Sequence, residues 1–179
     1  MTGDAPLPPM PAEPYPVLTE GARFDHVCVA GPALDPLLGL YVDVLGGRFV
    51  YGEVLPLGAV VVTVEFAGGG HVELMAPTPG SAFLDSFLAR TGGLGGLHHV
   101  TFVVPDLRSA VAEVVSAGGT VFGERYEDPY WSEAFVRPRD ASGVLVQLAT
   151  PGPRVADAMT TDLDALRRAA VVGTGPTGT

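Results

Sequence analysis

The segments FDHVCVA (residues 24–30) and LHHVTFVV (residues 97–104) decide the fold, because each begins one copy of a degenerate internal repeat. His26 in the first segment aligns with His99 in the second, at a separation of 73 positions. Further along, Glu73 in HVELMAP aligns with Gln147 in VLVQLATP at a separation of 74 positions. A repeat of this kind indicates two copies of one structural unit.

Each copy reads as strand, helix, strand, strand, strand. The β-branched runs that open the copies end at a proline, as strands often do. The next segments, PLLGLYVDVLGG and LRSAVAEVVSAGG, have apolar residues at helical spacing and stop at glycine, a common helix terminus. The AGGG and DASG turns between later apolar runs predict hairpins. The predicted fold class is therefore α+β, with two tandem βαβββ modules that form a shared cupped β-sheet cavity.

Four regions are predicted along the chain. Residues 1–21 are rich in proline and predict an extended arm. Residues 22–91 form the first module and residues 92–150 the second, with GGLGG at 92–96 as the linker between them. Residues 151–179 form a C-terminal tail in which VADAMTTDLDALRRAA predicts a short helix capped by Thr161 or Asp162, followed by a frayed glycine-rich end.

Composition restricts the partners. The 179 residues carry a formal net charge of −10, which argues against nucleic acid because phosphate binding needs clustered basic residues. No apolar run is long enough to span a membrane, and the N-terminus does not resemble a signal peptide, so a cytoplasmic protein is expected. A single cysteine agrees with a reducing compartment. The expected partner is a small-molecule substrate, and the apolar composition permits a homodimer.

Alternation along the strands places polar side chains among apolar ones. Successive side chains of a strand point to opposite faces. On strict alternation, the face of His26 also carries Phe24 and Cys28, and the face of His99 also carries Leu97 and Thr101. His71 and His98 are interpreted as supporting or surface residues, and Cys28 as a small core residue.

Four polar residues at repeat-equivalent positions predict a metal site. Buried polar groups are costly unless they have partners, and His26, Glu73, His99 and Gln147 can satisfy one another through one divalent cation. Imidazole and carboxylate ligands suit Co, Ni, Mn, Zn or Fe. The set carries one negative charge, so the centre stays positive and can hold substrate oxygens. An anionic substrate would need this cation or basic side chains, for which the candidates are Arg125, Arg137 and Arg139.

The segments FDHVCVA, HVELMAP, GLHHVTFVVPDL and RDASGVLVQLATP resemble the vicinal oxygen chelate superfamily over about residues 22–150. This superfamily includes glyoxalase I, extradiol dioxygenases and the fosfomycin- and bleomycin-resistance proteins. The run from ELMAP to GLHHVTFVV is most similar to the methylmalonyl-CoA epimerases of the superfamily. The resemblance implies metal ligands at His26, Glu73, His99 and Gln147.

Two departures from the epimerase pattern predict a rearranged site. The epimerases carry Gln at the position of Glu73 and Glu at that of Gln147, so the two ligands are exchanged here. They also carry a catalytic Glu on the third strand of the first module, where this chain has Val60, Val61 and Val62. The equivalent strand of the second module offers Glu133 in SEAFVRP. The hypothesis is that the site is exchanged about the pseudo-two-fold axis, with Glu133 or Glu73 as the catalytic base.

The leading functional hypothesis is a metal-dependent isomerase or epimerase that moves a proton next to a metal-chelated carbonyl, on an acyl-CoA or a similar oxygen-rich molecule. One alternative is a lactoylglutathione lyase of the glyoxalase I kind, which needs the same metal and base. An extradiol dioxygenase is less favoured, because the amide of Gln147 stands where iron needs a carboxylate. A metal-free binding or resistance protein and an enzyme of secondary metabolism are the remaining alternatives.

Overall fold

The computed structural model describes residues 21–170. The predicted N-terminal arm and glycine-rich end therefore lie almost wholly outside the described residues. The first module contains one strand, a helical segment and three further strands: β1 Arg23–Ala30, α1 Leu34–Leu38, the π-helical turn η1 Gly39–Val44, β2 Arg48–Leu55, β3 Ala59–Glu65 and β4 His71–Pro77. The second module repeats the order: β5 Gly96–Val103, α3 Leu107–Ser116, β6 Val121–Arg125, β7 Trp131–Val136 and β8 Val146–Pro151.

Three further helices lie outside this repeat. Helix α2 (Asp85–Arg90) connects the modules, in a segment that the sequence assigned to the end of the first module without predicting a helix there. Helices α4 (Val155–Ala158) and α5 (Leu163–Ala170) form the C-terminal segment. The side chain of Asp162 accepts a hydrogen bond from the backbone N–H of Ala165, which is the geometry of an N-terminal cap. No helix within residues 21–170 has both the length and the apolar character that a bilayer span requires.

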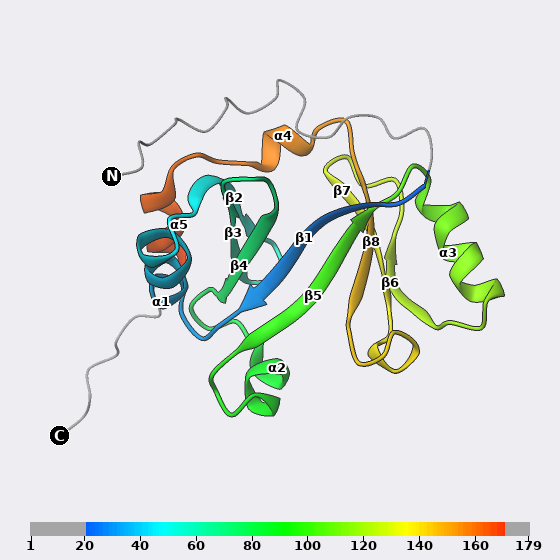
Figure 1. Ribbon diagram of the computed structural model, residues 1–179, viewed down its shortest axis with the longest axis horizontal. Coiled ribbons are helices and arrows are strands. Elements are labelled where there is room, and N and C mark those ends of the chain that lie inside the picture. The colour runs from blue at the N-terminus through cyan, green and yellow to red at the C-terminus, as the bar shows by residue number, and fades with distance from the viewer. Residues whose placement is uncertain (1–20, 171–179) are drawn as a thin grey trace.

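The eight strands form one sheet in the order β2-β3-β4-β1-β5-β8-β7-β6. Strands β1 and β5 pair antiparallel at its middle, and each pairs in parallel with the last strand of its own module, β4 or β8. Figure 1 shows the blue β1 and the green β5 side by side where the two modules meet. The predicted α+β class with two tandem βαβββ modules is confirmed, because each module supplies four consecutive strands of the sheet and the modules meet through their first strands.

Helices cover one face of this sheet. In the first module, Leu34 and Leu38 of α1 and Leu166 of α5 pack on alternate residues of β3 and β4, including Val62 and Leu74. In the second module, Leu107 and Val111 of α3 pack on residues of β7 and β8. Figure 1 shows α1 and α5 together at one end of the molecule and α3 at the other. Each fully buried aliphatic side chain contributes about 1.5–3 kcal/mol to stability. This packing fixes the strands of the sheet, and with them the side chains on the opposite face.

Strict alternation was wrong at two positions, because β1 and β5 each contain one extra residue. Phe24 pairs with Phe102 and His26 with Thr101, so Asp25 has no partner across the pair and Phe24 leaves the face of His26. Phe24 is half exposed and stacks edge-on against Phe102. The second irregularity removes Leu97 from the face of His99 in the same way, and Leu97 is exposed.

One linker glycine is required by the close approach of the two modules. Gly95 has a positive φ of 81°, and a side chain there would collide with the backbone of Ala30 at the end of β1. A residue with a Cβ would be strained at this φ and would force β5 away from β1. Gly95 in the GGLGG stretch therefore allows the pairing that brings the two modules together.

Candidate metal centre

Neighbouring strands bring the four predicted ligands to the middle of the sheet. Glu73 lies on β4, His26 on β1, His99 on β5 and Gln147 on β8, and these strands are consecutive in the sheet order. Cys28 lies between them, paired with Glu73 on one side and with His99 on the other. The repeat therefore places one polar residue from each of four adjacent strands on the face opposite the covering helices.

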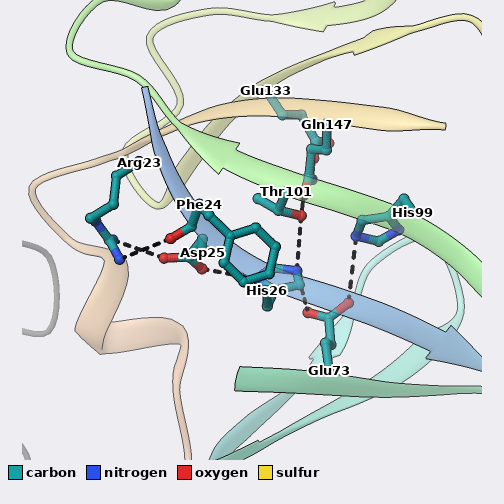
Figure 2. A network of polar contacts seen from close by, with 9 residues as sticks. All are labelled: Arg23, Phe24, Asp25, His26, Glu73, His99, Thr101, Glu133 and Gln147. Atoms are coloured by element: carbon teal, nitrogen blue, oxygen red, sulfur yellow. Dashed lines mark hydrogen bonds and ion pairs between the residues drawn. The ribbon is translucent and has the colours of Figure 1, made fainter. Parts of the chain in front are cut away.

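Three of the four predicted ligands converge. Nε2 of His26 lies 3.8 Å from one carboxylate oxygen of Glu73, and Nε2 of His99 lies 3.9 Å from the other. The ligand atoms all lie within 4.8 Å of one another, and both histidines are more than 90% buried. Figure 2 shows Glu73 reaching up between the two rings from the neighbouring strand. Two imidazoles and one carboxylate with their donor atoms turned inward fit a divalent transition metal or zinc.

The fourth predicted ligand, Gln147, is connected to this triad through the hydroxyl group of Thr101. The Thr101 hydroxyl donates to Oε1 of Gln147 at 2.6 Å and lies 3.0 Å from Nε2 of His26. The amide nitrogen of Gln147 donates to Glu133 at 2.6 Å. The buried amide oxygen of Gln147 thus points toward the histidines, while its nitrogen is engaged by an acid of the second module (Figure 2).

The two histidines have opposite electrostatic surroundings. Burial disfavours the charged form of His26, but Glu73 and the hydrogen bond to Asp25 outweigh it and raise the His26 pKa above its usual value. For His99, burial lowers the pKa well below the usual value, and the neighbouring His26 and His98 lower it further. His99 is therefore a neutral ring at physiological pH, which is the form that binds a metal.

Glu133 lies on the same face, beside Gln147. Its carboxylate accepts a hydrogen bond from the guanidinium of Arg125 at 3.1 Å, in addition to the bond from Gln147. Burial raises the Glu133 pKa, while Arg125 and the Gln147 amide oppose that rise. Of the three arginines predicted to meet an anion, Arg125 adjoins the site, whereas the guanidiniums of Arg137 and Arg139 lie against Phe122 and Thr120.

The strand register relates Glu133 to the valine segment of the first module. Val61 pairs with Met75, two residues after Glu73, just as Glu133 pairs with Ala149, two residues after Gln147. Val61 is therefore the residue of the first module that corresponds to Glu133. Its apolar side chain packs on the site face with Cys28 and Met75.

Sequence reasoning missed a second acid, Glu53. It lies on the edge strand β2, directly opposite Val61, and is only partly exposed. Burial raises the Glu53 pKa from 4.5 to about 7, with further repulsion from Glu73 and Glu133. Strands β2 and β7 are first and seventh in the sheet, so the electrostatic contact of Glu53 with Glu133 requires the sheet to curve. The available signal was a single acid in the apolar run FVYGEVL, facing the same side as the site.

A second group of possible ligands adjoins the triad. Cys28, His98 and His99 also have donor atoms within 4.8 Å of one another. Cys28 is fully buried, and burial together with the nearby Glu73 raises its pKa well above the usual value, so its thiol is protonated. His71, by contrast, is partly exposed and lies 4.0 Å from Glu65 at the end of β3.

The fold and the site together define a βαβββ-repeat protein with a candidate metal centre at the junction of its modules. The family model described as Glyoxalase/Bleomycin resistance protein/Dioxygenase superfamily matches residues 25–153. The chain belongs to this superfamily, which confirms the resemblance seen in its sequence.

Several relatives are named methylmalonyl-CoA epimerases. The chain is 32% identical over 130 residues to mitochondrial methylmalonyl-CoA epimerase of Mus musculus, covering 70% of this chain and 71% of the relative. It is similar in structure to methylmalonyl-CoA epimerase from Mycobacterium tuberculosis, with a TM-score of 0.62, 29% identity and coverage of 75% and 91%. A Streptomyces coelicolor methylmalonyl-CoA epimerase in complex with 2-nitronate-propionyl-CoA matches with a TM-score of 0.61, 28% identity and coverage of 72% and 94%.

Proposed function

We propose that this protein is a metal-dependent epimerase that inverts the carbon next to the thioester carbonyl of a small branched acyl-CoA such as methylmalonyl-CoA. The observation that carries the proposal is a His26, His99 and Glu73 triad with two partly buried acids, Glu53 and Glu133, on the same face. The names of the relatives supply the substrate class.

The triad supplies the ligands for a divalent cation, and Gln147 is the candidate fourth ligand through its amide oxygen. When bound, such a cation supplies a Lewis acid that stabilises the negative charge of an enolate. The remaining chemistry belongs to the side chains around it. Arg125, already engaged with Glu133, adds positive charge at the edge of the site.

Two acids suit epimerisation, because inversion needs one group to remove a proton and another to return one on the opposite face. Arg125 and Gln147 stabilise the ionised form of Glu133, so Glu133 is the base that takes the proton from carbon. Glu53, with a pKa of about 7, holds a proton at neutral pH and delivers it to the other face. Turnover leaves the proton on Glu133 and the charge on Glu53, and proton exchange with water restores both groups for the next turnover.

The direct test uses a single epimer of methylmalonyl-CoA in D2O with protein reconstituted with Co²⁺. We expect loss of optical purity together with deuterium uptake at the inverted carbon, and loss of both after chelation of the metal. If acyl-CoA substrates show no exchange but a 2-oxoaldehyde–glutathione adduct is turned over, the lactoylglutathione lyase alternative replaces this proposal. No turnover of either, with no metal retained, favours a binding protein.

Single substitutions separate the two acids from the metal site. Glu53→Gln and Glu133→Gln should each lower the epimerisation rate by about 10²–10⁴-fold, the usual contribution of a positioned acid or base. Metal content should remain unchanged in both variants, as measured by elemental analysis. Glu65→Gln is the matched control, because Glu65 lies at the end of β3 and contacts Arg48 and His71. Full activity in Glu133→Gln would refute the exchanged arrangement of the site.

A further inference from the structure

Two β-bulges lie in the central strand pair, one on each strand. Between the paired positions Phe24–Phe102 and His26–Thr101, β1 has one extra residue, which is Asp25. Between Cys28–His99 and Val29–Leu97, β5 has one extra residue, which is His98. The extra residue in each case immediately precedes a histidine of the triad, and the two positions correspond in the repeat. Bulges re-aim side chains and are frequent next to active sites.

Each bulge turns its extra side chain toward the histidine that follows it. Oδ2 of Asp25 lies 2.9 Å from Nδ1 of His26, and its other oxygen accepts a hydrogen bond from Arg23 at 2.8 Å. Nδ1 of His98 lies 2.8 Å from Nδ1 of His99. In a regular strand, consecutive side chains point to opposite faces, so neither pair would face one another without its bulge. Figure 2 shows Arg23, Asp25 and His26 as one chain of contacts.

These contacts determine which ring nitrogen of each histidine carries the proton and which is left to bind a cation. The carboxylate of Asp25, paired with Arg23, only accepts hydrogen bonds, so Nδ1 of His26 carries the proton. Nε2 of each histidine is the atom that faces Glu73, so it must keep its lone pair free to bind a cation. For His99 this requires a proton on Nδ1, and this N–H then donates a hydrogen bond to Nδ1 of His98.

We propose that Asp25 and His98 are the positioning residues of this centre. Each accepts a hydrogen bond from the Nδ1–H of the next histidine, so that Nε2 of that histidine is free to bind the cation. The inference rests on the proposed metal site, but not on the identity of the substrate. Asp25 is a carboxylate paired with Arg23 and almost wholly buried, whereas His98 is a half-buried imidazole packed edge-on against Phe87. The two modules thus use a carboxylate and an imidazole for the same task.

Metal affinity provides the first test. Titration with Co²⁺ against a chelator should show affinity about 10- to 100-fold weaker for Asp25→Ala and for His98→Ala, as for other residues that orient a ligating histidine. His98→Asn should recover much of the loss, because the amide oxygen of asparagine can accept from Nδ1 of His99. A packing role for His98 predicts no recovery, since asparagine does not restore the contact with Phe87. His71→Asn is the control and should bind as the wild type does, because His71 pairs with His26 in the strand register but its ring lies 4.0 Å from Glu65 and is not among the converging donor atoms.

Ring nitrogen spectra provide the second test. Long-range ¹H–¹⁵N correlation spectra of the full chain loaded with Zn²⁺ should show His26 and His99 protonated at Nδ1 and bound through Nε2. Unchanged affinity in both alanine variants, or ligation of His99 through Nδ1, would overturn the inference. A wild type that binds Zn²⁺ in this way but fails to epimerise acyl-CoA would refute the proposed function and leave the inference standing.

Discussion

The two halves of the candidate centre occupy the same positions in the repeat but carry different charges. Four pairs of residues correspond: Asp25 with His98, His26 with His99, Cys28 with Thr101, and Glu73 with Gln147. The first module supplies two carboxylates to these positions, and the second module supplies none. The pseudo-two-fold symmetry thus gives the geometry, while the departure from it gives the first module the negative charge that the proposed cation requires.

The acids proposed to move protons break the symmetry in another way. Glu133 lies on β7, and the corresponding residue of the first module is Val61. The acid of the first module, Glu53, lies one strand further out, on β2. The two carboxyls therefore sit in unlike surroundings, and only Glu133 has a guanidinium and an amide as hydrogen-bond donors. Unlike surroundings allow one acid to hold a proton while the other is ionised.

The largest expected effect on metal affinity comes from removing the charge of Glu73, the carboxylate ligand of the first module. Glu73→Gln should weaken Co²⁺ binding by about 1000-fold, because a unit charge pair at ~4 Å is worth about 4 kcal/mol near a protein surface. Epimerisation should fall with it. Gln147→Ala should weaken binding much less, since it removes no charge. Chelator competition measures both affinities, and a larger loss in Gln147→Ala would show that the second half dominates the metal site.

The triple variant Glu73→Gln, Gln147→Glu, Glu133→Gln moves the ligand charge from one half to the other. The third change is needed because Glu133 accepts from the Gln147 amide at 2.6 Å and would repel a new carboxylate there. We expect this variant to recover most of the Co²⁺ affinity lost in Glu73→Gln. Failure to recover any affinity would mean that the two halves are not interchangeable as ligand sites.

The pH dependence of turnover distinguishes the two acids next. Epimerisation needs one proton shared by Glu53 and Glu133, so kcat/KM should be bell-shaped. The pKa of Glu53 is about 7, and above that pH Glu53 loses the proton that it must deliver. We therefore expect kcat/KM to fall about tenfold per pH unit above this value, and the same profile from either epimer. Persistence of this limb in the residual activity of Glu53→Gln would assign it to another group.

The repeat made the fold predictable, together with the convergence of His26, Glu73 and His99, because periodicity and repeat-equivalent positions can be read directly from the sequence. The bulges at Asp25 and His98 were not predictable, because they depend on the register between strands more than 60 positions apart in sequence. Glu53 was missed for a related reason. Its role depends on the curvature that brings β2 toward β7, and the resemblance directed attention to Val60–Val62 on the next strand instead.

The smallest expected effect compares Cys28 with Thr101, which correspond in the repeat. Thr101→Val keeps the shape of the side chain but leaves two buried polar atoms without the hydroxyl: Oε1 of Gln147, which accepts from it, and Nε2 of His26. The expected loss is about 1–3 kcal/mol in the free energy of unfolding, the cost of unsatisfied buried groups. Cys28→Ala removes a weak donor whose partner, Glu73, keeps some exposure to water, so the loss should be about 1 kcal/mol. Urea denaturation of both metal-free variants measures the difference. A larger loss in Cys28→Ala would show that packing, and not hydrogen bonding, decides stability at the junction of the modules.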